Sequence, residues 1–500
     1  MFALLEYPIE SVFFYYKAFV RATVTANYKK KRKRSSGPKK ILHKRSAEAF
    51  FRAGFPLGAF FLLFYNSVDL TILCKVVDNF GDIGFVYRLA KNLVQLNPQR
   101  EIRIAVDNLA AFNKIESRVD PALAEQVLEV ACADSLQDQE GADKAGNEGK
   151  PKTTGRLRIF DATNAAVCAR EWTKKPARVI LECFQCGRPD WLEALLFDGV
   201  TRALIINIDY LTAEDYAEEF HRLKSGTRSP LVRKVNFMPG FTAKTGGLIL
   251  DAAATNNCSQ AKDCAGQVGI VGKTLTAGAA ETASKPKSAP ATENGFITKT
   301  AGPQILMFSY PKDFAPIIRA ILRWNKAAQV NLAQGAGKES FLAANENCLQ
   351  EQKAGGLFVR ELPFLSQEEW DKNLYAQDIL FVRGEDSLSR ACLSGKPFVW
   401  QAYLQDDNYQ LVKVRALLER MRPHFDADDF AVLENFWLLY NGAESSGKPK
   451  TAGAAMEEAC YGFLERSDKM KAGFEAFARS LFELGNFAER LDEFVSLQEL

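Results

Sequence analysis

The sequence predicts an α/β protein built from two Rossmann-like domains that face a central cleft. From residue 70 onward, short apolar runs alternate with helical apolar patterns, which is the rhythm of a doubly wound parallel sheet. Residues 251–303, rich in Ala, Thr, Lys, Ser and Gly, interrupt this rhythm as a low-complexity linker, and it restarts at residue 304. A chain of 500 residues is long enough to bury two separate cores.

The first domain is predicted over residues 69–250. The apolar run at 70–74 predicts a buried strand, and a helix is predicted next from the apolar positions Val86, Leu89, Ala90, Leu93 and Val94. Further strands are predicted at 102–106, 156–160 and 177–181, with a polar insert at 134–155.

The second domain is predicted over residues 304–478. Its strands are expected at 304–308, 356–361, 379–382 and 397–401, and a helix at 314–324. Residues 326–356 and 442–455 share the composition of the linker. Helical apolar spacing over 470–500 predicts a closing helix pair, with residues 479–500 packing back on the first domain. Two such domains form the GT-B arrangement of nucleotide-sugar glycosyltransferases, which other proteins share, so this observation predicts only a fold class.

Residues 1–68 are predicted to be a disordered extension outside the fold. They carry thirteen Lys and Arg against three Glu, a net charge of +10 that leaves −7 for the rest of the chain. The apolar run at 55–65 is interrupted by Pro56 and Gly58 and is shorter than the ~20 residues that cross a bilayer. We prefer a disordered extension, or a start codon placed too far upstream, to a tail that binds membrane or nucleic acid.

The cysteines and acidic motifs favour a reducing compartment and no metal. Ten cysteines are scattered without a disulfide-like framework, which predicts a cytoplasmic protein. Cys183 and Cys186 lack the second pair or the histidines that a zinc site needs, so chance placement is preferred. Asp426 and Asp428 match a DxD pattern but precede a helical pattern, so helix capping is the preferred interpretation.

The loop after the first strand carries two acids, Asp78 and Asp82, and two glycines, Gly81 and Gly84. Ligands bind at the carboxyl ends of strands in open α/β sheets, so acids at this place predict chemistry rather than scaffolding. The loop lacks GxGxxG, and no GxxxxGK[ST] occurs, which weakens the dinucleotide and P-loop interpretations.

A second set of polar residues follows the strand at 379–382. Asp386 and Ser387 are suitable N-cap residues, and a capped helix start with Arg383 beside it would suit a diphosphate. Glu385 would repel a phosphate and is expected to face the cleft and a cationic partner. From this segment alone, a capping box with an incidental ion pair is equally well supported.

The two segments together resemble the EarP family, the protein-arginine rhamnosyltransferases that modify bacterial elongation factor P. Matching motifs run in the family's order from about residue 70 to 500, outside the low-complexity inserts. They are Val76-Val77-Asp78-Asn79-Phe80-Gly81-Asp82-Ile83-Gly84, Asn236-Phe237-Met238-Pro239-Gly240-Phe241-Thr242, Thr245-Gly246-Gly247-Leu248, Pro363-Phe364-Leu365-Ser366-Gln367, Phe381-Val382-Arg383-Gly384-Glu385-Asp386-Ser387 and Gly395-Lys396-Pro397-Phe398-Val399-Trp400.

The resemblance implies a GT-B fold and inverting, metal-independent transfer of L-rhamnose from TDP-β-L-rhamnose to one arginine of elongation factor P. It implies that this modification serves rescue of ribosomes stalled at polyproline, with no nucleic acid partner and no stable membrane insertion. The acids Asp78, Asp82 and Glu385 carry over as catalytic, with Asp82 the general base, and Asn79, Phe80, Gly81 and Gly84 as the acceptor-side loop. The implied donor-binding residues are Phe308, Tyr310, Phe364, Gln367, Arg383, Asp386 and Ser387.

The chemistry of arginine agrees with three acids at one site. A guanidinium is a poor nucleophile because its lone pairs are delocalised, and carboxylates can grip it bidentately and aim one nitrogen at the anomeric carbon. Two alternatives stay open: a GT-B transferase with another nucleotide sugar or a small acceptor, and a non-catalytic module that binds through the basic extension.

Some positions depart from the family's pattern. Leu404 stands where the family has Pro, Gln410 where it has His, and Leu250-Asp251 where it has Arg-Glu. These departures put fine contacts to the sugar or the acceptor in doubt.

Overall fold

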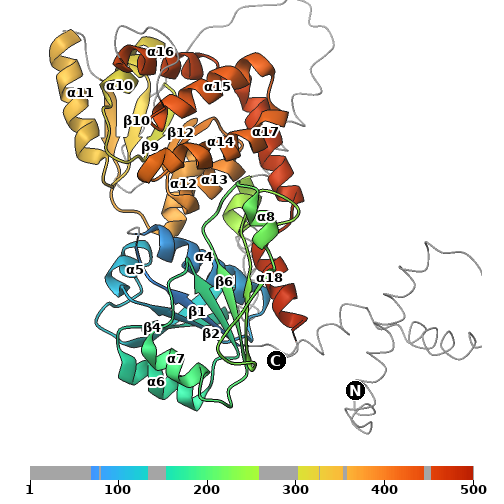
Figure 1. Cartoon of the computed structure of the whole chain (residues 1–500). Coiled ribbons are helices and arrows are strands. Elements are labelled where there is room, and N and C mark those ends of the chain that lie inside the picture. The colour runs from blue at the N-terminus through green and yellow to red at the C-terminus, as the bar shows by residue number, and fades with distance from the viewer. Residues whose placement is uncertain are drawn as a thin grey trace, which may run out of the picture. The chain divides into compact units, whose positions relative to one another are not determined.

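The computed structural model describes residues 69–77, 80–132, 154–257, 302–325, 327–352, 357–443 and 452–498 (Figure 1). The extension at 1–68, most of the insert at 134–155 and most of the linker at 251–303 lie outside the described residues. Asp78 and Asn79 lie outside them as well, so the roles predicted for these two side chains stay predictions.

The N-terminal part of the fold is an eight-stranded sheet in the order β3-β4-β2-β1-β5-β6-β8-β7. Six strands pair in parallel, while the edge strands β3 and β7 run antiparallel to their neighbours. The strands are β1 (Leu70–Cys74), β2 (Ile102–Val106), β3 (Glu125–Ala131), β4 (Thr154–Asp161), β5 (Val179–Cys183), β6 (Ala203–Ile208), β7 (Lys224–Ser225) and β8 (Val232–Asn236). The predicted strands are confirmed, and β3, β6, β7 and β8 are additional.

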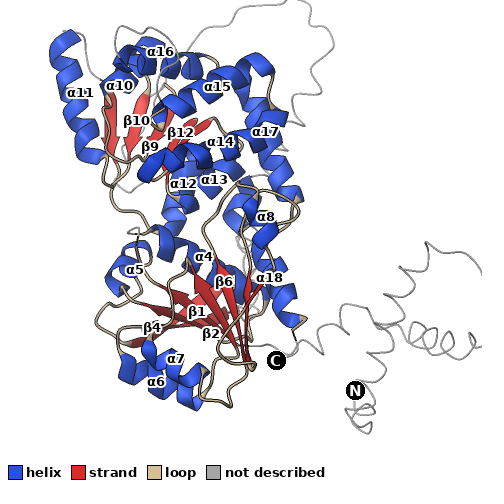
Figure 2. Ribbon diagram, in the orientation of Figure 1, coloured by secondary structure: helices blue, strands red, loops and turns tan. Residues whose placement is uncertain are grey.

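Helices cover both faces of this sheet (Figure 2). They are α4 (Gly81–Leu96), α5 (Leu109–Ile115), α6 (Ala165–Lys174), α7 (Asp190–Leu196) and α8 (Tyr216–Phe220). One apolar core joins Leu70 and Ile72 to Val86 of α4, and a second joins Leu73 on the other face to Trp172 of α6. Strands buried on both faces are mostly apolar, and β1 and β2, each with one buried polar residue (Thr71 and Arg103), could be predicted with their observed bounds.

The C-terminal part contains a five-stranded parallel sheet in the order β11-β10-β9-β12-β13. Its strands are β9 (Gln304–Met307), β10 (Gln329–Leu332), β11 (Phe358–Glu361), β12 (Ile379–Arg383) and β13 (Phe398–Gln401). Its helices are α10 (Ala315–Trp324), α11 (Lys338–Gln352), α12 (Gln367–Ala376), α13 (Glu385–Ser394), α14 (Tyr409–Met421), α15 (Ala427–Tyr440), α16 (Ala452–Glu465) and α17 (Ser467–Glu483), with the short turns η3 (Asp406–Asn408) and η4 (Arg422–His424). The α/β class and the two Rossmann-like sheets of the GT-B arrangement are confirmed.

The linker-like composition at 326–356 and 442–455 was misleading where the structure describes these segments. Strand β10 and helix α11 lie within the first, and α16 begins within the second. Their Ala-rich composition is compatible with helix as well as with a linker, because Ala has the highest helix propensity.

The last helix, α18 (Phe487–Ser496), belongs to the core of the N-terminal sheet. Leu481 of α17 still packs in the C-terminal core, whereas Phe487, Leu491 and Val495 pack with α4 and the first sheet. Gly485, with φ of +86°, lies in the connection between the two helices, where a left-handed backbone favours glycine. From Phe487 onward, the chain therefore packs against the N-terminal part of the fold.

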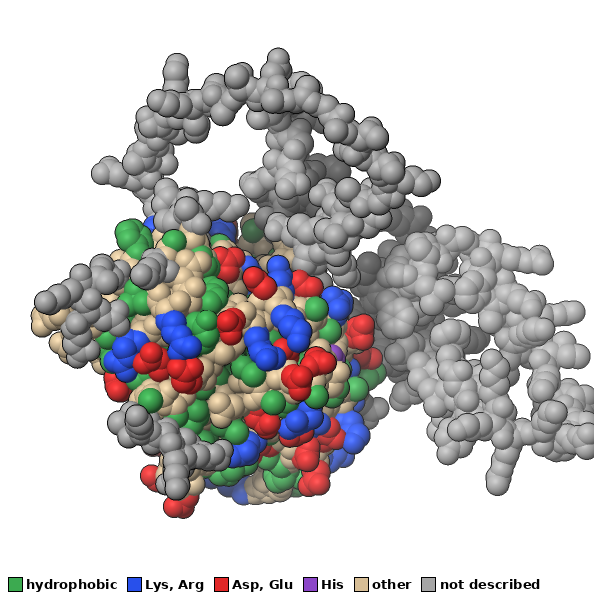
Figure 3. Space-filling view, turned by 90° about the horizontal axis from the view of Figure 1, so that it is seen from above, with side chains coloured by type: hydrophobic (Ala, Val, Ile, Leu, Met, Phe, Trp, Pro, Cys, Tyr) green, Lys and Arg blue, Asp and Glu red, His purple; other side chains and the backbone are tan. Residues whose placement is uncertain are grey.

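The surface of the described residues is mixed in charge. On the face drawn in Figure 3, basic and acidic side chains are interspersed. Within the described residues, no helix combines the length and apolar composition needed to cross a membrane.

Candidate functional site

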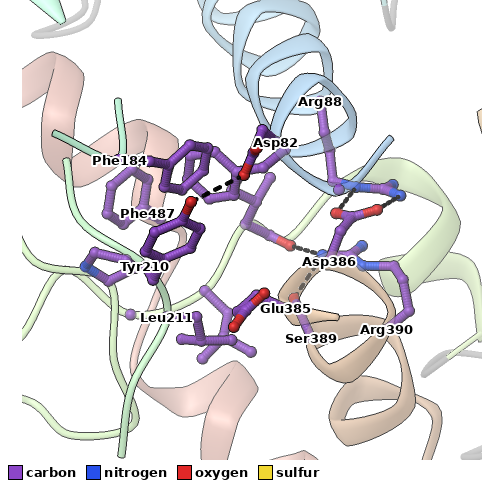
Figure 4. A pocket seen from close by; sticks show the side chains of 16 residues that line it. Asp82, Arg88, Phe184, Tyr210, Leu211, Glu385, Asp386, Ser389, Arg390 and Phe487 are labelled. Carbon is purple, nitrogen blue, oxygen red and sulfur yellow. Dashed lines mark hydrogen bonds and ion pairs between the residues drawn. The ribbon is translucent and has the colours of Figure 1, made fainter. Parts of the chain in front are cut away.

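A pocket lies where the start of α4 meets the start of α13 (Figure 4). Its empty space is about 480 Å³, open solvent included. Residues from the N-terminal and the C-terminal parts of the fold line the pocket. They are Gly81, Asp82, Phe85 and Arg88 of α4, Glu385, Asp386, Ser389 and Arg390 of α13, Phe184, Tyr210 and Leu211 after β5 and β6, and Pro239, Gly247, Leu248, Ile249 and Phe487.

The fold brings these two helices together because each follows a strand at its carboxyl end, α4 after β1 and α13 after β12. Gly84 marks the close approach: a Cβ at this position would lie 3.8 Å from both Asp386 Oδ2 and Gln367 Nε2. A side chain larger than alanine would therefore push these residues of α13 and α12 away from α4.

Asp82 is the second residue of α4 and is almost fully buried, with 2% of its surface exposed. Its Oδ2 accepts a hydrogen bond from the Val77 amide at 2.7 Å, and its Oδ1 accepts one from the Tyr210 hydroxyl at 3.3 Å. The helix N-terminus adds favourable electrostatics for a carboxylate at this place. The carboxylate is thus held at both oxygens on the wall of the pocket.

Glu385 is the first residue of α13 and lines the same pocket as Asp82. The predicted capping by Asp386 or Ser387 is wrong: the N-cap is Gly384, and no side chain caps the helix. Gly384 has φ of 71° and ψ of 162°, a conformation essentially restricted to glycine, so the tight turn between β12 and α13 excludes Asp or Ser as the cap. Glu385 follows this turn and enters the pocket, as Figure 4 shows.

A buried ion cluster, the Arg88 cluster, joins the two sheets beside the pocket. It consists of Arg88, Arg390, Asp251, Asp371 and Asp386. Arg88 contacts Asp386 at 2.9 Å and 3.0 Å, Asp371 at 2.6 Å and 3.0 Å, and Asp251, while Arg390 contacts Asp251 at 3.0 Å. Burial alone would raise the pKa of Asp386, but the Arg88 guanidinium outweighs burial and holds that pKa below its ordinary value.

Three of the predicted donor-binding residues meet at the carboxyl ends of β9 and β12. The guanidinium carbon of Arg383 lies 4.5 Å from the ring centroid of Phe308 and 4.5 Å from that of Tyr310. The Tyr310 amide donates to the Gln401 side chain at 2.8 Å, which fixes this segment to β13. A cation held between two rings presents its edge in a defined plane.

Of the other predicted donor-binding residues, Phe364 and Gln367 contact residues at the start of α4, and Ser387 lies in α13. Phe364 is half exposed and meets the Phe80 ring edge-on at 5.5 Å, and Gln367 Nε2 donates to the Gly84 carbonyl at 2.7 Å. Ser387 is buried in the first turn of α13, next to the Asp386 carboxylate that Arg88 holds. The binding roles of all these residues stay predictions.

Several residues of the site escaped the sequence analysis. Arg88 and Asp371 lie in helical patterns without a motif, and Tyr210 follows β6, a strand that was not predicted. Phe184 lies inside the Cys183–Cys186 motif, which the structure shows to be a turn closed by a hydrogen bond from the Cys186 amide to the Cys183 carbonyl. Asp426 caps α15 by accepting from the Asp428 amide at 3.0 Å, as predicted.

The three departures from the family's pattern have different surroundings. Asp251 belongs to the Arg88 cluster, and Gln410 is buried and accepts from the Gln405 amide at 3.3 Å. Leu404 is 59% exposed. Gln410 and Asp251 therefore have partners in the fold, and Leu404 is a surface side chain.

Comparison with known proteins supports a single family. The chain matches the family described as Elongation-Factor P (EF-P) rhamnosyltransferase EarP over residues 70–148 and 151–496. The protein-arginine rhamnosyltransferase of Pseudomonas putida is 29% identical over 375 residues, which cover 74% of this chain and 86% of the relative. That of Neisseria meningitidis serogroup B is 25% identical over 436 residues, covering 85% and 96%.

Among solved structures, one described as "Structural basis for EarP-mediated arginine glycosylation of translation elongation factor EF-P" is 20% identical. It covers 85% of this chain and 97% of that chain, with a TM-score of 0.45. The family match, which spans both sheets and both sides of the pocket, is what assigns the chain. The protein belongs to the EarP family of elongation factor P rhamnosyltransferases.

Proposed function

We propose that this protein transfers L-rhamnose from TDP-β-L-rhamnose to a guanidino nitrogen of one arginine of elongation factor P, with inversion at the anomeric carbon. The observation that carries the proposal is the placement of Asp82 of α4 and Glu385 of α13, which follow strands of different sheets and line one pocket. Membership of the EarP family supports the sugar and the acceptor. As the family resemblance implies, the modified elongation factor P would act in the rescue of ribosomes stalled at polyproline.

On the acceptor side, the two carboxylates would act on the guanidinium cation. Glu385 would accept hydrogen bonds from N–H groups of the guanidinium and hold the positive charge of the guanidinium on the nitrogens that do not react. The reacting nitrogen would then face Asp82. A carboxylate fixed at both oxygens, as Asp82 is, holds its orientation without reorganisation when the substrate binds. Orientation of this kind can contribute several kcal/mol to lowering the barrier.

The transfer step would be a single in-line displacement. The guanidino nitrogen forms a bond to the anomeric carbon while the bond from that carbon to the phosphate oxygen of TDP breaks. Asp82 takes the proton from the attacking nitrogen, and the electron pair of the broken bond leaves with TDP. One displacement inverts the anomeric centre.

The charge that develops on TDP needs positive partners. Arg383 at the end of β12 and the backbone amides at the start of α13 would supply them, and we propose that no metal takes part. Phe308 and Tyr310 would hold the Arg383 guanidinium in its plane, while Phe364 and Gln367 would contact the thymine.

The test is to incubate the protein with TDP-rhamnose and elongation factor P and to read the intact mass of the factor. A single deoxyhexose on one arginine is expected, lost in Asp82→Asn and in Glu385→Gln. Asp190→Asn is the matched control, because Asp190 also begins a helix of the N-terminal sheet but lies exposed outside the pocket. A folded, TDP-binding protein that adds no sugar to the factor would refute the proposal and favour another nucleotide sugar or a small acceptor.

A further inference from the structure

Two aromatic side chains form a stack on the wall of the pocket that carries Asp82. The rings of Phe184 and Tyr210 lie 4.5 Å apart between centroids and 19° from parallel, and both line the pocket (Figure 4). Phe184 follows β5 and Tyr210 follows β6, which are neighbouring parallel strands of the first sheet. Their side chains therefore meet at the carboxyl edge of the sheet, where Asp82 lies.

The backbone that presents Phe184 is strained. Phe184 has φ of 57° and Gln185 φ of 52°, so two consecutive residues other than glycine occupy the left-handed region. This conformation is uncommon for a bulky side chain and persists only where the surrounding structure enforces it.

Contacts on both sides of the Phe184 loop enforce this conformation. The Phe184 amide donates to the Ile208 carbonyl at 2.7 Å, which ties the loop to the end of β6. The Phe184 ring also meets the Phe85 ring of α4 at 5.3 Å and an interplanar angle of 64°. The strained loop thus fixes one ring between α4 and Tyr210.

Tyr210 in turn contacts Asp82. Its hydroxyl donates to Asp82 Oδ1 at 3.3 Å, while the Val77 amide donates to Oδ2. The amide belongs to the chain just after β1 and the hydroxyl to the chain just after β6, so the two donors together determine the plane of the carboxylate.

Among the described residues, titratable groups near Asp82 include members of four elements. Arg88 belongs to α4, and Glu385, Asp386 and Arg390 belong to α13. Cys74 of β1 and Cys183 of β5 are buried thiols whose pKa values burial raises well above the ordinary value, and both therefore stay neutral.

We propose that Tyr210 is the positioning residue for Asp82 and that Phe184 holds the Tyr210 ring in place for this task. The proposal rests on the proposed function, in which Asp82 accepts the proton of the acceptor guanidinium. The Tyr210 hydroxyl, which donates to Oδ1, holds the carboxylate in one orientation on the wall of the pocket.

The test compares Tyr210→Phe with the wild-type enzyme in rhamnosylation of elongation factor P. Removal of the hydroxyl leaves the ring and its stack in place, so the melting temperature should stay close to that of the wild type. We expect kcat to fall about tenfold, with KM for TDP-rhamnose and for the factor within about twofold.

Two further variants separate positioning from general structural effects. Tyr461→Phe removes a tyrosine–glutamate hydrogen bond on α16, outside the pocket, and should leave kcat unchanged. Phe184→Gly relieves the left-handed strain but removes the ring, so the protein should stay folded while kcat falls in the same direction as in Tyr210→Phe.

The proposal is overturned if Tyr210→Phe keeps the wild-type kcat. It is also overturned if KM rises while kcat stays constant, because Tyr210 would then bind substrate rather than position the base. Failure of the proposed function is a different result, since the wild-type enzyme itself would then add no sugar to the factor.

Discussion

Arg88 of α4 and Asp386 of α13 form a bidentate ion pair, with Nε–Oδ1 at 2.9 Å and Nη2–Oδ2 at 3.0 Å. The two residues are 298 positions apart in the chain, and their helices carry Asp82 and Glu385. The pair therefore sets how α4 meets α13, the helix that begins beside Arg383. The stability of this contact and the geometry of the pocket depend on the same guanidinium.

Replacement of Arg88 by methionine should destabilise the protein strongly. The substitution leaves Asp251, Asp371 and Asp386 with one cation fewer in a site where Arg88 is 1% exposed. Removal of one partner from a buried ion pair costs about 3–5 kcal/mol. The free energy of unfolding from urea denaturation measures the effect.

Arg170→Met is the control for the Arg88 substitution. Its side chain is 54% exposed and pairs with Glu125 and Glu171, so its loss should cost less than about 1 kcal/mol. Equal effects of the two substitutions would contradict the structural role of the Arg88 cluster.

The Arg88 cluster should also make the protein sensitive to acid. The Arg390 and Arg88 charges outweigh burial and lower the pKa of Asp251, and Arg88 does the same for Asp386. Carboxylates with lowered pKa in the folded state contribute stability above the unfolded pKa of about 3.9 and lose it as the pH falls toward the folded value. Urea midpoints measured from pH 5 down to about pH 2.5 should fall less steeply in Arg88→Met than in Arg170→Met.

His221 should make stability depend on pH in a higher range. Burial and the charges of Arg222 and Arg490 lower the pKa of His221 to about 4. Below its ordinary value of about 6.5 the unfolded chain binds a proton that the folded chain excludes, so stability falls as the pH decreases from about 6.5 to 4. The urea midpoint over this range measures the loss.

His221→Asn tests the assignment of that loss. Asparagine can still accept the hydrogen bond that His221 Nδ1 receives from the Met238 amide at 3.1 Å, but it does not titrate. The variant should match the wild type near pH 7.5 and lose less stability down to pH 4.5. An unchanged slope would assign the pH dependence to other groups.

Arg383→Lys should weaken donor binding. Lysine keeps the charge but loses the planar fork and the contact with the Phe308 and Tyr310 rings. We expect the affinity for TDP to fall about tenfold or more, as measured by calorimetry, with binding of elongation factor P unchanged.

Arg323→Lys is the matched control for Arg383→Lys. The Arg323 guanidinium lies over the Tyr461 ring at 3.8 Å, yet it pairs with Glu458 on the surface, outside the pocket. Equal TDP affinity in Arg383→Lys and wild type would remove Arg383 from the donor site.

The strands that could be predicted are those whose buried residues are mostly apolar. Residues 70–74 and 102–106 have the same bounds in the sequence analysis and in the structure, because both strands are buried on both faces. Strand β10 was missed because two of its buried residues are amides, Gln329 and Asn331. Asn331 donates to Gln304 at 3.0 Å and to Gln377 at 2.7 Å, so its burial depends on partners from other elements.

Local sequence thus established the alternation of strands and helices and the placement of Asp82, Arg383 and Glu385 at the carboxyl ends of strands. The contacts of those residues came from the folded chain. Tyr210 and Asp82 are 128 positions apart in the sequence, and Arg88 and Asp386 are 298 positions apart. No local sequence pattern predicts either contact. The periodicity of strands and helices is a property of residues that are close in the sequence. Hydrogen bonds and ion pairs in a cleft depend instead on the order of the strands in the sheet, because this order decides which helices lie next to each other.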